Sequence, residues 1–267
     1  MRLAAISSGS KGNCILVNNE KSTFLVDAGI SKKRIEEGLD AFNVSPEDVD
    51  GILITHEHSD HIKGLGVWLR KYKMPVYATD ETIKCILNDG SLGKIDSDLF
   101  NVVEPGKELV LKDLQIKPLS ISHDAANPVC YRFNSDLNEK SCAVVTDLGK
   151  PTETLVNNLQ ELNTVLIESN HDVGMLQAGP YPYYLKQRIW GERGHLSNEA
   201  CGDLINSIIN KDMHNIILGH LSGENNYPDL AFQAVRNEIN FAKHKFYAED
   251  VNLKVASRNE PSCDVEF

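Results

Sequence analysis

The heptapeptide THEHSDH, at residues 55–61, decides the fold of this chain. It brings four side chains that bind metals close together: His56, His58, Asp60 and His61. Imidazole and carboxylate ligands at such short spacing suit Zn²⁺ and similar transition metals. One tight turn cannot direct all four at a single ion without strain. We therefore predict two neighbouring ions, with His56 and His58 on one and Asp60 and His61 on the other. The alternative is a polar loop with incidental histidines, although three of the chain's nine histidines fall here.

Short β-branched runs alternate with helical patterns on both sides of this motif. Strands are predicted at the N-terminus and at 24–29, 51–56, 75–79, 114–123, 142–149, 164–171 and 215–220. Amphipathic helices are predicted at 31–42, 152–162, 197–210 and 228–242, two of them with serine N-caps at Ser31 and Ser197. The aromatic segment 175–194, rich in proline and glycine, is expected to form a helix plus a loop. The pattern indicates an α/β protein with mixed sheets and a single domain spanning 1–267.

Five of the predicted strands end on a polar residue that could bind metal. These residues are Asp27, His56, His123, Asp147 and His220. Strand ends that open into loops at one edge of a sheet are where α/β proteins collect functional side chains. Packing alone does not explain five such endings, so we expect these residues to meet at one site.

An HxHxDH motif after an apolar strand, followed by isolated His, Asp and His residues, resembles the metallo-β-lactamase fold. That resemblance implies a four-layer αββα sandwich of two mixed β-sheets, with a dinuclear metal site along one edge. It implies that the first ion is bound by His56, His58 and His123, and the second by Asp60, His61 and His220. Asp147 would bridge the two ions, because a carboxylate has two oxygens. Asp27 would lie behind the ligands and orient one of them.

The residue between the first two motif histidines separates branches of this superfamily. The redox di-iron branch has a glutamate where this chain has His58, so the resemblance implies a hydrolytic site. Zn²⁺, Mn²⁺ and Fe²⁺ all accept this set of nitrogen and oxygen ligands. We therefore expect two divalent ions per chain, of which Zn²⁺ and Mn²⁺ are the first candidates.

The tetrapeptide Gly-His-Leu-Ser occurs twice, at 194–197 and at 219–222. In the phosphodiesterase branch of the fold, which includes nucleases similar to tRNase Z, a Gly-His motif precedes the last metal ligand by about one helix. Its histidine faces the scissile phosphate. The resemblance therefore implies that His220 binds metal and that His195 protonates the leaving oxygen or stabilises phosphate charge. The alternative is that 194–197 is only a turn in which Ser197 caps the next helix.

Further motifs, including SSGSKGN near the start and YPYYLKQRIWGERGHLSN, resemble the YycJ/WalJ family of bacterial metallo-hydrolases. The resemblance implies a cytoplasmic DNA exonuclease that acts 5′ to 3′ and uses a hydroxide activated by two metal ions. Asp60 and His195 would take part in catalysis. The alternatives are a hydrolase of a small phosphodiester, thioester or lactone and, further from the pattern, an interaction protein that binds metal without catalysis.

The remaining expectations come from composition and from isolated residues. The net charge of −11 argues against an extended basic groove for nucleic acid, although bound dications would offset the carboxylates locally. No signal peptide or membrane span is visible, which favours the cytoplasm, and a homodimer is possible. Six scattered cysteines are expected to be reduced. Lys11, Asn13 and His171 are weaker candidates for contact with substrate.

Overall fold

The computed structural model describes residues 1–267 and contains two seven-stranded sheets. The first sheet has the strand order β14-β1-β2-β3-β4-β5-β6, and the second β13-β12-β11-β10-β9-β8-β7. Strands of the first sheet are β1 (Arg2–Ser7), β2 (Cys14–Asn18), β3 (Thr23–Val26), β4 (Gly51–Leu53), β5 (Val76–Ala78), β6 (Phe100–Val102) and β14 (Ser262–Glu266). Strands of the second are β7 (Leu109–Leu111), β8 (Leu114–Ser120), β9 (Val129–Ser135), β10 (Ser141–Val145), β11 (Thr164–Glu168), β12 (Asn215–Gly219) and β13 (Asn252–Val255).

Nine α-helices cover the outer faces of the sheets or project from one edge. They are α1 (Lys32–Ala41), α2 (Ser59–Ile62), α3 (Leu65–Tyr72), α4 (Asp80–Asn88), α5 (Glu153–Asn158), α6 (Val173–Ala178), α7 (Tyr183–Trp190), α8 (Asn198–Ile208) and α9 (Pro228–Phe241). Short 3₁₀ turns occupy Pro46–Asp48, Gly90–Leu92, Ser97–Leu99 and Ala248–Asp250. None of the helices combines the length and the apolarity needed to cross a bilayer.

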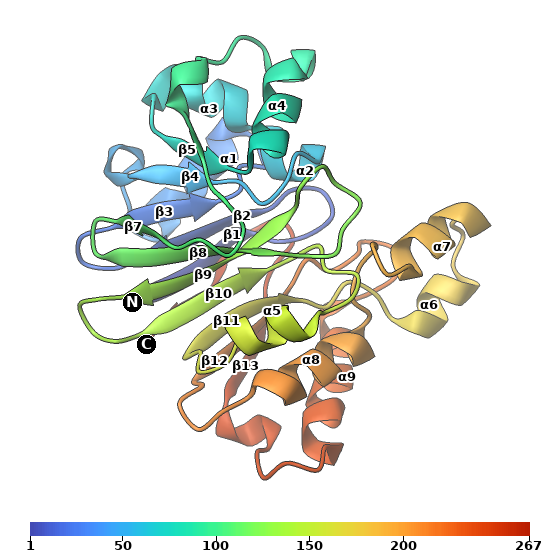
Figure 1. The fold of residues 1–267 in the computed structure, drawn as a ribbon. Coiled ribbons are helices and arrows are strands. Elements are labelled where there is room, and N and C mark those ends of the chain that lie inside the picture. The colour runs from blue at the N-terminus through green and yellow to red at the C-terminus, as the bar shows by residue number, and fades with distance from the viewer.

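Figure 1 shows the four layers, with α1, α3 and α4 above the first sheet and α5, α8 and α9 below the second. Three apolar clusters fill the spaces between the layers. Trp68 of α3 belongs to the cluster between the first sheet and its helices. Ile205 of α8 belongs to the cluster between the second sheet and its helices. Phe24 and Tyr131 lie between the two sheets. The αββα sandwich predicted from the sequence is therefore confirmed.

Two predicted elements differ from the structure for identifiable reasons. The helix predicted at 152–162 ends at Asn158, because the Arg132 side chain binds the carbonyl oxygens of Asn158 and Gln160. The segment 175–194 forms parts of two short helices, α6 and α7, rather than one helix and a loop. Pro180 and Pro182 separate the two helices, since proline cannot continue the hydrogen bonding of α6. Both helices project beyond the sheets at one edge (Figure 1).

Candidate metal centre

The polar residues that follow the strands meet at the sheet edge from which α6 and α7 project. Asp27 follows β3, Asp147 follows β10 and His220 follows β12. All three have left-handed backbone conformations, with φ of 64°, 60° and 53° respectively. This region is uncommon for residues other than glycine, and such residues concentrate at functional sites. The sharp turns end the strands and place these side chains in one space.

The motif at 55–61 is packed tightly against the backbone that follows β3. A Cβ added to Gly29 would lie 1.6 Å from the carbonyl oxygen of Asp60, so only glycine allows this approach. The amide of Asn13 donates to the same oxygen at 2.8 Å. The short helix α2 begins after His58, and it carries Asp60 and His61. The motif is therefore fixed by backbone contacts, and its side chains divide into two groups.

The first group consists of His56, His58 and His123, with ligand atoms within 4.8 Å of one another. The Nδ1 of His123 lies 3.1 Å from the carbonyl oxygen of Gly194, to which it donates, and its Nε2 lies 3.2 Å from Nδ1 of His58. Arg193 binds the His123 carbonyl oxygen and holds this loop in place. These contacts point the Nε2 lone pair of His123 toward the other two rings.

The second group consists of Asp60, His61 and His220. Nδ1 of His61 donates to Oδ2 of Asp27 at 2.7 Å, so its Nε2 is the ring nitrogen directed toward the other ligand residues. Asp27 also accepts the amide and hydroxyl hydrogens of Thr55. Nε2 of His220 lies 3.5 Å from Oδ2 of Asp60. Asp27 thus lies behind His61.

Asp147 lies between the two groups and is buried. Its Oδ2 lies 3.1 Å from Nε2 of His61, and its Oδ1 lies 3.7 Å from Nε2 of His123. Burial alone would raise the pKa of Asp147, but the charges of His220 and His61 hold that pKa well below its ordinary value. The carboxylate is therefore ionised, and it lies within reach of residues of both groups.

Three buried atoms of the expected ligands have no hydrogen-bond partner: Nε2 of His56, Oδ2 of Asp147 and Nε2 of His220. Buried polar atoms without partners are costly and call for an explanation such as a bound ion. All three are donor atoms that divalent transition metals accept, and they lie among the residues of the two groups. The site fits divalent metal, and the residues expected to bind it are brought together.

Glu168, the last residue of β11, was missed in the sequence. Its Oε1 accepts hydrogen bonds from Nδ1 of His195 at 2.8 Å and from Nδ1 of His220 at 2.7 Å. Its Oε2 accepts from the amides of Leu148 and Leu196. Burial raises the pKa of Glu168, but the His195 charge and hydrogen bond outweigh it and lower the pKa to about 2. The sequence contains a signal for Glu168, because β11 ends on this polar residue at the same sheet edge as the neighbouring strands.

His195 lies on the wall of a cavity of about 230 Å³ that opens onto both groups. Its side chain is 22% exposed, and its Nδ1 is held by Glu168, so its Nε2 is the ring nitrogen left free. A Cβ on Gly194 would lie 2.1 Å from the Ile189 carbonyl oxygen, and the His195 amide donates to that oxygen. The Gly-His turn is therefore locked against the end of α7.

The residues proposed for substrate contact lie elsewhere. Lys11 is exposed and does not line the cavity, although its neighbour Ser10 does. Asn13 is buried, with its Nδ2 3.1 Å from Nε2 of His61. His171 is also buried away from the cavity wall, and burial lowers its pKa to about 4. The structure does not bring these three side chains to the cavity.

One basic residue that was not singled out for the site does line the cavity. Arg188 of α7 binds Oδ2 of Asp124 at 2.5 Å. Oδ1 of Asp124 lies 3.5 Å from Nε2 of His123. This ion pair joins α7 to the first group of histidines. The guanidinium of Arg188 is the positive charge that the chain itself supplies on the cavity wall.

The six cysteines form no disulfide, as expected. Four of them are buried, and burial raises the pKa of Cys130 to about 12. A thiol with so high a pKa is neutral and serves as a small apolar side chain. None of the cysteines belongs to the groups that could hold metal.

Comparison with known proteins agrees with this geometry. Residues 8–173 match the family model of the metallo-beta-lactamase superfamily. The chain is 42% identical over 238 residues to the exodeoxyribonuclease WalJ of Streptococcus pneumoniae, covering 89% of this chain and 88% of the relative. It is 37% identical over 235 residues to the exodeoxyribonuclease YycJ of Bacillus anthracis, covering 88% of each.

Solved structures share the fold at lower identity. YhfI of Bacillus subtilis, described as a metallo-beta-lactamase fold protein, has a TM-score of 0.69 and 14% identity, covering 98% of this chain and 99% of that one. The short form of human tRNase Z has a TM-score of 0.67 and 13% identity, with coverage of 98% and 99%. The chain belongs to the metallo-β-lactamase superfamily of hydrolases and, within it, to the WalJ/YycJ family.

Proposed function

We propose that this chain is a metal-dependent exonuclease that hydrolyses DNA phosphodiesters from the 5′ end. The observation that carries the proposal is the pair of ligand groups joined by Asp147, with His195 on the cavity wall beside them. The relatives in Streptococcus and Bacillus that carry the name exodeoxyribonuclease support DNA as the substrate. The shared apolar cluster between the sheets supports a single domain, 1–267, as the unit that acts.

The two groups would hold two divalent ions, Zn²⁺ or Mn²⁺, and Fe²⁺ would also fit the donor set. His56, His58 and His123 would hold the first ion, Asp60, His61 and His220 the second, and Asp147 would lie between them. When bound, such ions supply Lewis acidity, which lowers the pKa of water to about 7 and neutralises charge on the phosphate. Asp27 and Glu168 orient ligand rings, through His61 and His220 respectively.

The chain's own residues supply the proton for the leaving oxygen. Glu168 binds Nδ1 of His195, so the free Nε2 can carry a proton toward the cavity. Burial lowers the pKa of His195, but the charge and hydrogen bond of Glu168 and the charge of Asp147 together raise that pKa above its ordinary value. The imidazole is thus kept protonated until the leaving alkoxide requires the proton. Arg188, on the same wall, would bind a non-bridging phosphate oxygen.

A nuclease assay on end-labelled duplexes, with Zn²⁺, Mn²⁺ and Fe²⁺ added one at a time to metal-depleted protein, tests substrate and cofactor together. We expect mononucleotides to be released from the labelled 5′ end, with little release from the 3′ end. Bis(p-nitrophenyl) phosphate and a set of lactones and thioesters serve as the comparison. The cavity of about 230 Å³ would also admit such small esters. Turnover of a small ester with inert DNA would replace the nuclease by a metabolite hydrolase.

A further inference from the structure

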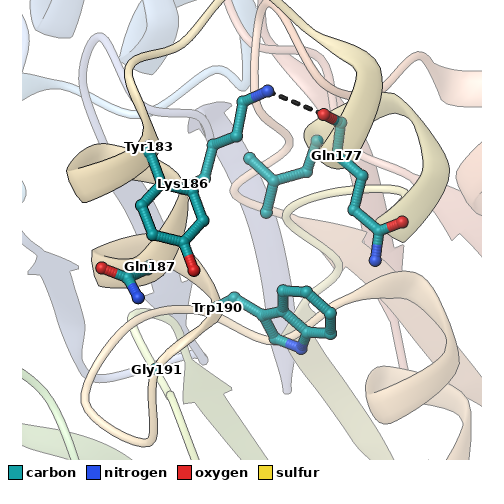
Figure 2. Close-up of a pocket in the computed structure, with 7 residues that line it drawn as sticks. Gln177, Tyr183, Lys186, Gln187, Trp190 and Gly191 are labelled. Atoms are coloured by element: carbon teal, nitrogen blue, oxygen red, sulfur yellow. Dashed lines mark hydrogen bonds between the residues drawn. The ribbon is translucent and has the colours of Figure 1, made fainter.

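A second cavity, of about 510 Å³, lies on the far side of α7 from the metal centre. Leu176 and Gln177 of α6 form one wall, and Tyr183 and Trp190 of α7 form another. Figure 2 shows the rings of Tyr183 and Trp190 beside the amide side chains of Gln177 and Gln187. The volume lies within the range of small-ligand pockets. This cavity plays no part in the chemistry described above.

The aromatic rings at this cavity are open to solvent. The exposed fraction is 74% for Tyr183 and 56% for Trp190, and the adjacent Tyr184 is 73% exposed. Isolated apolar side chains are common on protein surfaces, but three aromatic rings on one eight-residue helix form a patch. Tyr183 and Trp190 both line the cavity, and more than half of each residue is exposed.

The charge of α7 is opposite to that of the chain as a whole. The helix carries Lys186 and Arg188 and no acidic residue, whereas the net charge of the chain is −11. Lys186 lines the second cavity, and its Nζ donates to the backbone oxygen of Gln177 (Figure 2). Aromatic rings next to basic side chains are the combination by which proteins hold single-stranded nucleic acid. A polyanion with flat bases complements this surface.

The second cavity and the metal cavity share α7 as a wall. Leu185, Arg188 and Ile189 of this helix line the metal cavity, while Tyr183, Lys186 and Trp190 line the other. The end of α7 is locked to His195, as described for Gly194. A helix with its side chains is about 10–12 Å wide. The two cavities therefore lie on opposite faces of α7, and a strand that reaches both must pass around this helix.

We propose that the cavity between α6 and α7 binds a nucleobase of the substrate strand, a few nucleotides from the scissile phosphate. The base stacks on Trp190 and Tyr183, and Lys186 binds the adjoining backbone phosphate. Gln177 and Gln187 offer amide groups to the base edge. The inference rests on the proposed nuclease function and adds to it the site that holds the strand. It predicts that α7 contacts the substrate on both of its faces.

Kinetics on two substrates tests the proposal. Trp190→Ala should raise KM for a single-stranded oligonucleotide about 5- to 100-fold, because one stacked base contributes that much to affinity. Bis(p-nitrophenyl) phosphate does not reach the second cavity, so its kcat/KM should stay within about 2-fold. Trp190→Phe keeps an aromatic face and should recover most of the loss. Phe241→Ala, which removes an 85% exposed ring outside the cavity, should change neither substrate.

Abasic nucleotides locate the bound base. One abasic residue is moved along the oligonucleotide, and we expect KM to rise at one position, a few nucleotides from the scissile bond, and not at the others. The rise should disappear in Trp190→Ala, since the ring that the base would contact is absent. Equal losses on both substrates would show that Trp190 only supports the metal cavity. Unchanged kinetics on both would remove the cavity from DNA binding.

Tryptophan fluorescence separates this proposal from the nuclease proposal. The chain has two tryptophans, and Trp68 is fully buried, so a ligand-dependent change reports Trp190. A phosphorothioate oligonucleotide added to metal-loaded protein should quench the signal in the wild type and not in Trp190→Phe. Quenching without any DNA cleavage would retain the base site and reject the nuclease. DNA cleavage without quenching, or with unchanged kinetics in Trp190→Ala, would retain the nuclease and reject the base site.

Discussion

The two Gly-His-Leu-Ser copies have the same sequence and the same carboxylate partner but different surroundings. His195 and His220 both donate Nδ1 to Oε1 of Glu168. His195 is 22% exposed on a cavity wall, whereas His220 is 1% exposed with its Nε2 beside Asp60. The difference arises from the backbone. The first copy follows a loop and begins α8, and the second leaves β12 with a left-handed turn at His220. A short motif thus gains its chemistry from the element that precedes it.

The largest expected effect comes from a substitution in the second copy, whose histidine, His220, is buried. His220→Ala should abolish turnover and reduce bound metal, because it removes an Nε2 that has no partner other than an ion. Asp147→Ala and His58→Ala should do the same. Elemental analysis of purified variants and the nuclease assay measure both quantities. A fully metal-loaded, active His220→Ala enzyme would contradict the ligand assignment.

The exposed copy should behave differently. His195→Ala should reduce kcat about 10²–10⁴-fold, the usual contribution of a positioned acid, while metal content stays unchanged. A DNA analogue with an activated leaving group that needs no proton should recover much of the lost rate. If His195→Ala loses metal as His220→Ala does, the two copies share one role and the comparison fails.

A change at Glu168 acts on both copies at once. Glu168→Gln should weaken metal binding about 10–100-fold, because a partner that orients a ligand ring is lost. It should also slow the reaction, since His195 is no longer held. Asp27→Asn is the matched control, because Asp27 binds His61 and does not contact His195. Both variants should need more metal for half-maximal activity, and at saturating metal only Glu168→Gln should remain slow. Recovery of both variants at saturating metal would remove Glu168 from the support of His195.

The smallest expected effect concerns Ser197, the serine of the first copy. Ser197 accepts the amide hydrogen of Ala200 and caps α8, so Ser197→Ala should lower the free energy of unfolding by about 1 kcal/mol. Its activity at low temperature should equal that of the wild type. Urea denaturation followed by circular dichroism measures the change. Loss of activity without loss of stability would show that this serine does more than cap the helix.

The prediction from sequence succeeded where local pattern and topology coincide. The motif at 56–61 and the strand endings at Asp27, Asp147 and His220 are adjacent to strong apolar runs, so their convergence could be anticipated. Glu168 was missed because the run before it was interpreted only as a strand. Its role becomes visible only when two histidines, from 27 and 52 residues away, are seen to share one oxygen.

Other features depend on contacts that no local pattern contains. The early end of α5 depends on Arg132, which lies on strand β9 and binds the Asn158 carbonyl oxygen. The strands β6, β7, β13 and β14 are short or partly exposed, and they form because a neighbouring strand offers hydrogen bonds. Asn13 is adjacent to a glycine-rich turn and was expected to be open to substrate. It is buried because that turn packs against Asp60.

The strand order of the first sheet has a consequence for biosynthesis. β1 pairs with β14, and the Arg2–Asp264 ion pair joins residues 262 positions apart. At about 5–20 residues per second, translation leaves one side of β1 without its neighbour for roughly 13–50 s. An open strand of this kind can pair with another nascent chain. That edge therefore stays open to such pairing until β14 is made, and slow codons near the 3′ end of the message would lengthen this period.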